Sequence, residues 1–171
     1  MPRKAIHDLN VRDFTYVVAN MRDEDFEEIN ALFPEAVARG DYGPLLAKAA
    51  FEGPGYSAWI DDEPVAVFGA GMSDSYSTAI AWAFGTRQFK RAAGMISHFY
   101  KHKLSHDLYN AGVTRLEARA LGTHDYARNW LKRLGFHEDC ELPYYGRNGQ
   151  SFFLYSFTLA DYNRMFKNRL N

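Results

Sequence analysis

The most constraining feature of this 171-residue chain is the segment 113–138, VTRLEARALGTHDYARNWLKRLGFHE. Its first part is mostly apolar up to Gly122, which predicts a strand. Apolar residues then recur at the spacing of one buried helical face, at Ala127, Trp130, Leu131 and Leu134. Gly135 permits the left-handed turn that ends a helix, and Phe136 would enter the core behind it. The segment therefore predicts a strand, a helix and a second strand, with Thr123 or Asp125 capping the helix.

The rest of the chain predicts a sheet with helices packed against it. β-branched and aromatic runs or alternation predict strands at 15–19, 56–60, 64–72, 78–84 and 151–159. Helical periodicity predicts helices at 22–33, 42–51 and 92–109, and a helical tail at 160–171. Strands and helices thus alternate over most of the chain, which indicates an α/β (α+β) fold.

Composition sets limits on the class of protein. With 171 residues and 47% hydrophobic residues, the chain can bury the core of a single domain spanning 1–171. A net charge of −1 gives no long-range attraction to nucleic acid or to an acidic membrane. Cys140 has no partner for an internal disulfide, and neither a signal peptide nor an apolar membrane span is visible. We therefore expect a soluble, cytoplasmic protein that binds neither nucleic acid nor membrane.

The order of elements and the 113–138 segment resemble the Gcn5-related N-acetyltransferase (GNAT) superfamily over residues 14–159. The resemblance implies one domain with a central mixed, mostly antiparallel, splayed sheet of six to seven strands, flanked by about four helices. It also implies acetyl-CoA as cosubstrate and no metal. The sheet would splay around 83–86 and 118–121. A backbone N–H of the strand 78–84 would there polarise the thioester carbonyl.

The cofactor loop of the superfamily matches residues 87–92 in part. In family members this loop has the pattern basic-or-Gln-x-x-Gly-x-Gly/Ala, where x is any residue. Its backbone N–H groups bind pyrophosphate. Lys90 stands where the first Gly is expected. The basic side chains either bind phosphate by charge or form an ordinary solvated turn. The resemblance implies these cofactor-binding residues: Phe84, Thr86, Arg87, Gln88, Lys90, Arg91, Ala92, Ala127 and Trp130.

The catalytic residues of the superfamily are harder to match. Acyl transfer from a thioester to an amine needs a base for the amine and an acid for the leaving thiolate. Leu131 stands where family members have the Tyr that acts as the acid. His124 stands where they have an Asn at the start of the helix. Tyr126 is the substitute acid that the sequence offers, unless it packs on the sheet and water serves instead.

Two residues are candidate bases. Glu117 lies in the strand of the 113–138 segment, and His124, whose ordinary pKa is near neutral, lies at the break before the helix unless it only caps it. A third set of histidines, His98, His102 and His106, recurs every four residues. No carboxylate or cysteine has a matching spacing, so no metal site is predicted.

Two functions of different classes follow. The first is an acetyl-CoA-dependent N-acetyltransferase acting on an amine of a small molecule or a protein. The ending 157–162 resembles the ribosomal-protein-acetylating branch. The second is a non-catalytic virion or partner-binding component, in a virion or the host cytoplasm, with virion proteins as partners. Residues 88–91, 130–132 and 149–152 resemble a small internal virion protein of short-tailed bacteriophages, which shares the missing Gly and the Leu. The oligomeric state is left open, a homodimer included.

Overall fold

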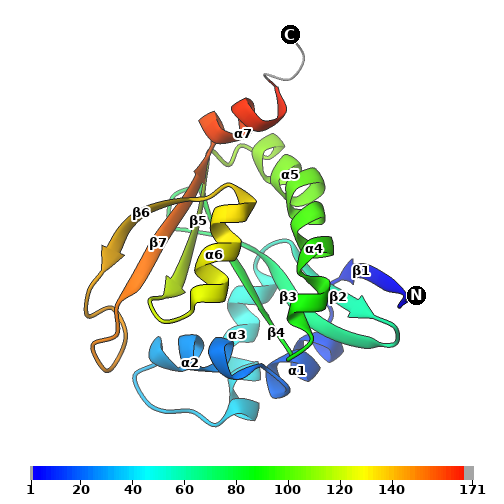
Figure 1. Ribbon diagram of the computed structural model, residues 1–171, viewed down its shortest axis with the longest axis vertical. Helices are drawn as coiled ribbons and strands as arrows, with labels where there is room; N and C mark the ends of the chain where they lie inside the picture. Colours follow the sequence, from blue (N-terminus) through cyan, green and yellow to red (C-terminus); the bar gives the residue numbers. More distant parts are fainter. Residues whose placement is uncertain (1, 168–171) are drawn as a thin grey trace.

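The computed structural model describes residues 2–167 and contains a seven-stranded sheet (Figure 1). The strands are β1 Lys4–Asp8, β2 Gly55–Ile60, β3 Glu63–Met72, β4 Thr78–Gly85, β5 Arg115–Leu121, β6 His137–Leu142 and β7 Phe152–Thr158. Their spatial order is β1-β2-β3-β4-β5-β7-β6, and β4 and β5 are the pair that runs parallel. The predicted mixed, mostly antiparallel α/β sheet is confirmed.

The helices in residues 2–167 outnumber the four or so that were predicted. They are α1 Val11–Ala19, α2 Asp23–Ala31, α3 Tyr42–Phe51, α4 Phe89–Phe99, α5 Ser105–Asn110, α6 Asp125–Leu134 and α7 Leu159–Phe166. The predicted helix 92–109 begins earlier, at Phe89, and a π-helical turn at Tyr100–Leu104 joins its two halves. A 3-10 turn at Arg39–Asp41 precedes α3.

The strand prediction at 15–19 was wrong, because these residues belong to α1. The Asn10 side chain accepts a hydrogen bond from the Asp13 N–H at 2.9 Å and caps the helix. Phe14, Val17 and Val18 then fall on one helical face and are buried. Burial of that face outweighs the β propensity of the Thr and Val residues. The sheet instead gains β1, an edge strand with charged ends that had not been predicted.

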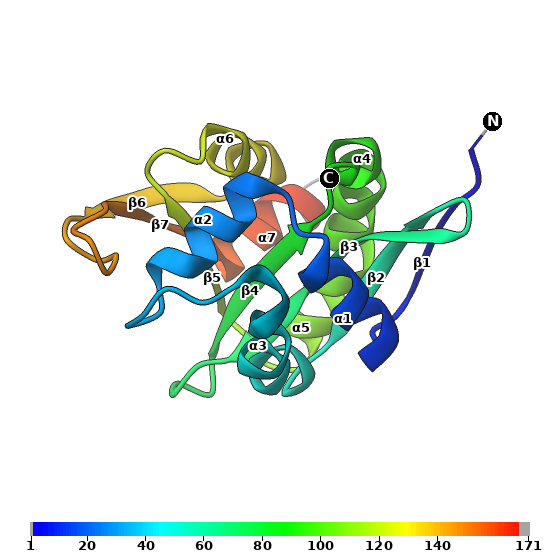
Figure 2. The same ribbon diagram turned by 90° about the horizontal axis from the view of Figure 1, so that it is seen from below.

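The helices cover the two faces of the sheet, here called the α2 face and the α6 face (Figure 2). On the α2 face, α1, α2 and α3 bury one apolar cluster that includes Phe14, Tyr42 and Phe84. On the α6 face, α4 to α7 bury a larger cluster that includes Phe89, Leu116 and Leu134. Side chains of β4 alternate between the two clusters, as the period of a strand requires: Ala81 and Ala83 pack on the α6 face, and Trp82 and Phe84 on the α2 face.

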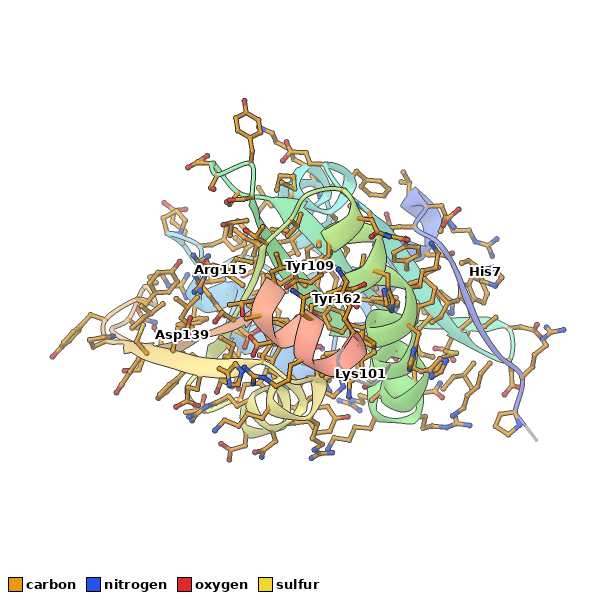
Figure 3. The ribbon with its side chains drawn as sticks, turned by 90° about the horizontal axis from the view of Figure 1, so that it is seen from above. His7, Lys101, Tyr109, Arg115, Asp139 and Tyr162 are labelled. Atoms are coloured by element: carbon orange, nitrogen blue, oxygen red, sulfur yellow. The ribbon has the colours of Figure 1, made fainter. Side chains whose placement is uncertain are left out.

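The helix α7 closes one end of the molecule. Thr158 and Asp161 form a reciprocal capping box, and Tyr162 stacks on Tyr109 of α5 with 4.6 Å between ring centroids (Figure 3). Beside it, Arg115 donates to Asp139 at 2.6 Å. The predicted helical tail is thus confirmed as far as Phe166, and residues 168–171 lie outside the described part.

The sheet opens between β4 and β5. These strands pair at Thr78 with Arg115, Ala79 with Leu116 and Ile80 with Glu117, and then diverge. β4 stays paired with β3 as far as Gly85, and β5 stays paired with β7 as far as Leu121. The gap therefore lies between two central strands, each of which keeps its other neighbour. The gap includes both predicted regions, 83–86 and 118–121.

Candidate active site

A cavity of about 370 Å³ passes through the gap between β4 and β5. On the α6 face its wall includes Ile96, Tyr100, Leu104, Ala127, Trp130, Leu131, Leu134 and Phe136, and on the α2 face Asp25, Glu28, Ile29, Leu32, Leu46, Ala49, Glu52 and Trp82. Between them, the diverging strands contribute the small side chains of Ala81, Ala83, Ala118 and Ala120, and β4 and β5 also contribute the larger Ile80, Phe84 and Arg119. Because its lining comes from both faces, the cavity extends through the sheet at the gap.

The open edge of β4 offers backbone hydrogen-bonding groups to this cavity. The Gly85 N–H donates to Asp25 and the Gly85 carbonyl accepts from the Arg22 N–H, so both point away from β3. The N–H groups of every second residue in a strand point to the same side. The N–H of Ala83, two residues before Gly85, therefore points into the gap as well. Such an N–H can bind a carbonyl oxygen placed between the strands.

Asp25 forms a buried network at the open end of the gap, across which α2 lies (Figure 2). One carboxylate oxygen accepts from Arg22 Nε and from the Gly85 N–H, each at 2.8 Å. The other oxygen is 2.8 Å from His124 Nε2. The side chains of Asp25 and His124 are 4% and 2% exposed. One carboxylate thus joins α2 to the end of β4 and to the start of α6.

His124 is the N-cap of α6, so the prediction that Thr123 or Asp125 caps this helix was wrong. Its Nδ1 accepts from the Ala127 N–H at 3.4 Å, which leaves Nε2 to carry the proton donated to Asp25. A ring with two nitrogens can cap a helix and bind a carboxylate together, and neither Thr nor Asp can do both at this position. His124 is buried and fixed, and it does not line the cavity.

The Arg22 guanidinium extends the network to α4. Its Cζ lies 4.2 Å from the centroid of the Phe89 ring and 5.2 Å from that of Tyr126. Both rings attract the cation through their π faces. The Phe89 ring also packs edge-on against Trp130, with 5.2 Å between centroids. The first turns of α2, α4 and α6 therefore meet around one buried ion pair.

Glu28 is the carboxylate that the sequence did not single out. One oxygen accepts from the Leu121 N–H at 2.7 Å, at the end of β5, and the side chain lines the cavity. Burial raises the pKa of this carboxyl to about 7, although His124 nearby opposes the shift. Glu28 can therefore exchange a proton near neutral pH. In the sequence it is one of several acids on α2, and only the fold shows which of them faces β5.

The predicted cofactor-binding residues divide into two groups. Phe84, Ala127 and Trp130 line the cavity, and the Trp130 Nε1–H donates to Ser97 Oγ at 2.8 Å. Thr86 and Ala92 are buried in the turn that begins α4. The Thr86 carbonyl accepts from the Phe89 N–H at 2.9 Å, and its hydroxyl accepts from the Gln88 N–H at 3.2 Å.

The other group lies on the surface at the start of α4. Arg87, Lys90 and Arg91 are exposed. The Gln88 side chain donates to Glu63 at 2.8 Å and accepts from Arg91 at 2.5 Å. Lys90 Nζ lies 5.1 Å from the centroid of the Tyr126 ring, so this side chain reaches from α4 toward α6. Of the three cations, Lys90 is the one placed toward α6, whereas Arg87 lies 3.9 Å from Asp23 of α2.

Tyr126 and Glu117 are not among the residues that line the cavity. The Tyr126 ring packs edge-on against Phe89 at 6.2 Å. Glu117 accepts from Arg115 Nε at 2.7 Å and is 3.7 Å from Arg119. The structure brings neither residue together with Glu28, whose carboxylate faces the space between the strands.

Tyr100 is a residue of the cavity wall that the sequence did not single out. It is 6% exposed, and its hydroxyl has no hydrogen-bond partner among residues 2–167. Burial holds the pKa of the phenol well above its usual range. Tyr100 begins the π-helical turn, a departure from helical periodicity that is frequent at functional sites. It shares the cavity wall with Leu131, the position at which GNAT enzymes have their Tyr.

Residues 2–167 contain no group of three or more His, Cys, Asp or Glu side chains placed to hold a metal ion. His98 and His102 lie side by side on α4 and the π-helical turn, with 4.4 Å between ring centroids. His106 contacts Tyr162 and Phe166 of α7 instead. Within the same residues, every helix is too short or too polar to cross a bilayer.

Comparison with known proteins identifies the fold. The sequence matches no protein-family model and is similar to no curated protein. The structure superposes on a GNAT-family acetyltransferase from Bacillus anthracis with a TM-score of 0.66, over 94% of this chain and 99% of that one, at 12% identity. For a ribosomal-protein-alanine N-acetyltransferase from Brucella melitensis the TM-score is 0.66, the coverage 91% and 99%, and the identity 14%. This chain has the GNAT fold.

A third GNAT-like structure bears on the cavity. It is yncA from Salmonella typhimurium, solved with its cofactor acetyl-CoA, and it superposes with a TM-score of 0.64 over 91% of this chain and 94% of that one. The identity is 9%. Similarity at this level shows a shared fold, and function has to be argued from the residues of the site.

The Asp25 network gives a first prediction. Replacing Asp25 by Asn should lower the free energy of unfolding by about 3–5 kcal/mol, because Arg22 would be left as a buried cation without its anion. Urea denaturation followed by circular dichroism measures the change. The exposed neighbour Glu24 is the control, since Glu24→Gln should alter stability by less than about 0.5 kcal/mol. Equal stability of both variants would contradict the proposed importance of the network.

Glu28 gives a prediction about pH. Its folded-state pKa of about 7 lies above its ordinary value of 4.5, so the folded state binds more protons between these two values. Stability should therefore fall as pH rises from about 4.5 to 7, by at most about 3 kcal/mol. Glu28→Gln should remove this decrease and be more stable than the parent at pH 8. Denaturation at pH 5 and pH 8 tests this, with the exposed Glu27→Gln as control, and parallel pH profiles for all three proteins would refute it.

Proposed function

We propose that this protein is an acetyl-CoA-dependent N-acetyltransferase that acts on a primary amine. The observation that carries the proposal is the cavity through the splayed sheet, which is lined by a carboxylate with a pKa near neutral and lies beside the exposed cations at the start of α4. A thioester can enter from the α6 face and an amine from the α2 face, so both can meet between β4 and β5. The acetyl-CoA bound to the structural relative yncA supports this choice of cosubstrate.

The residues at the start of α4 fit the phosphates of CoA in an altered way. A helix N-terminus attracts anions through its free N–H groups and its dipole. Here the N–H groups of Phe89 and Arg91 already donate to the carbonyls of Thr86 and Gln88. Side-chain charge from Arg87, Lys90 and Arg91 would then supply the attraction that a Gly-rich loop supplies by bare backbone. The pantetheine arm would lie along the open edge of β4, against Ala127 and Trp130.

The transfer itself can be assigned to residues of the cavity. Glu28 accepts a proton from the amine, and the amine nitrogen attacks the thioester carbonyl carbon. The Ala83 N–H donates to the carbonyl oxygen as negative charge develops on it. The C–S bond then breaks, and the departing sulfur receives a proton. Tyr100, a residue of the cavity wall, is the donor that we propose, and Tyr126 or water are the alternatives.

A second candidate function is a non-catalytic virion or partner-binding protein with the same fold. Two residues favour it: Lys90 replaces the glycine of the cofactor loop, and Leu131 replaces the Tyr of catalytic relatives. On this hypothesis Glu28 and the cavity have no acetyl-CoA to act on. Binding of acetyl-CoA therefore discriminates between the two functions.

Calorimetric titration with acetyl-CoA is the corresponding experiment. The parent chain should bind with micromolar affinity, and Lys90→Glu should bind about 10- to 100-fold more weakly, because a charge-assisted contact with phosphate contributes about 1.5–3 kcal/mol. Arg12→Glu, at an exposed position of α1, is the charge-reversal control and should bind like the parent. Absence of binding by the parent at millimolar acetyl-CoA would overturn the proposal and favour the non-catalytic alternative.

The acid can be identified by a matched pair of variants. If Tyr100 protonates the sulfur, Tyr100→Phe should lower kcat by at least about tenfold, while acetyl-CoA affinity and folding change little. Tyr126→Phe should then leave kcat within about twofold of the parent. Release of free CoA thiol, followed with a chromogenic disulfide, gives kcat for both. The opposite ranking would assign the role to Tyr126, and two unaffected variants would leave water as the donor.

A further inference from the structure

The mouth of the cavity on the α2 face is apolar at its rim. Leu32 of α2, Met72 at the end of β3 and Tyr145 in the β6–β7 connection line it and are 49%, 50% and 45% exposed. Leu46 of α3 and Trp82 of β4 continue the same surface inward. Five segments distant in the sequence thus bring large apolar side chains to one opening. Exposed apolar side chains gathered in this way mark a binding site more often than ordinary surface.

Among residues 2–167, three carboxylates and one cation are the charged residues that line the cavity. Glu28 accepts from a single backbone N–H, whereas the Glu52 carboxylate lies 4.0 Å from Lys48. Asp25 also lines the cavity, but its charge is balanced by the buried Arg22. Arg119 is a cation of the lining, and it lies 3.7 Å from Glu117 and 5.8 Å from the Tyr145 ring centroid. A cationic ligand is therefore favoured over an anionic one, and its charge would be attracted toward Glu28.

These two properties together define a substrate class. We propose that the acceptor is a primary amine carried on an apolar aromatic or aliphatic body, bound at the α2-face mouth with its nitrogen toward Glu28. Acetylation of this amine rests on the proposed function, whereas its binding at the mouth does not require acetyl-CoA. A free arylalkylamine and a peptide with an apolar first residue present the same chemistry. Polyamines and acidic amino acids do not.

Three probes separate the two properties. 2-Phenylethylamine has both the apolar body and the cation, 3-phenylpropanoate has the apolar body with an anion, and 1,4-diaminobutane has cations without an apolar ring. Titration of the chain with each, without acetyl-CoA, should show 2-phenylethylamine binding at least about tenfold more tightly than the other two. Equal or tighter binding of either comparison compound would overturn the proposal.

A pair of variants on α3 tests the location. Ala49 is exposed and lines the mouth, so Ala49→Phe should fill it without disturbing the core and should weaken 2-phenylethylamine binding by about tenfold or more. Leu45 is exposed on the same helix but does not line the cavity, so Leu45→Phe is the control and should bind like the parent. Equal effects of the two changes would place the amine elsewhere and overturn the assignment.

Release of free CoA thiol from acetyl-CoA in the presence of each amine tests the proposed function separately from this inference. Binding of 2-phenylethylamine without any CoA release supports the site and counts against acetyl transfer. Acetylation of 1,4-diaminobutane in preference to 2-phenylethylamine supports transfer and overturns the substrate class. If 2-phenylethylamine is acetylated, a Phe-Gly-Gly peptide amide is tested as a second acceptor. Faster acetylation of the peptide indicates a protein N-terminus as substrate, and faster acetylation of the free amine indicates a small molecule.

Discussion

The carboxylate of Asp25 is the interaction on which the geometry of the site depends. The β4–β5 gap removes the hydrogen bonds that would normally hold two central strands together. Asp25 replaces part of that ladder by accepting from Gly85 at the end of β4, while His124 connects it to the helix that follows β5. Removing charges from water is unfavourable, so this arrangement persists because Arg22 and the two further donors satisfy both oxygens. The sheet can therefore stay open without collapsing.

Two carboxylates of α2 differ in the number of hydrogen bonds that they accept. Asp25 accepts from several donors and is fixed as part of the framework, whereas Glu28, one helical turn further on, accepts from a single backbone N–H. Burial without full compensation is what shifts a pKa toward neutrality. A framework carboxylate and a reactive one can thus lie on the same short helix, distinguished only by how many donors reach them.

The strand–helix–strand segment, the hairpin and the order of the central elements could be predicted from the sequence, because periodicity and glycine placement act locally. Gly135 has a φ of 101° and Phe136 is buried, as their positions in the motif indicate. Phe84, Ala127 and Trp130 line the cavity, and their role in cofactor binding, which only the family resemblance indicated, stays a prediction. Glu28 and Tyr100 could not be predicted, since one depends on a contact with a strand 93 residues away and the other on a π-helical turn that local periodicity conceals.

A cavity lined from both faces of the sheet also affects the order of events in the proposed reaction. In a pocket with a single entrance, the first molecule to bind can block the second, and products must leave in a fixed sequence. In the proposed reaction the thioester and the amine approach the gap from opposite faces, so neither has to wait for the other to arrive or depart. With this geometry steric access does not impose a binding order, and the two reactants must occupy the site together for the group to pass directly between them.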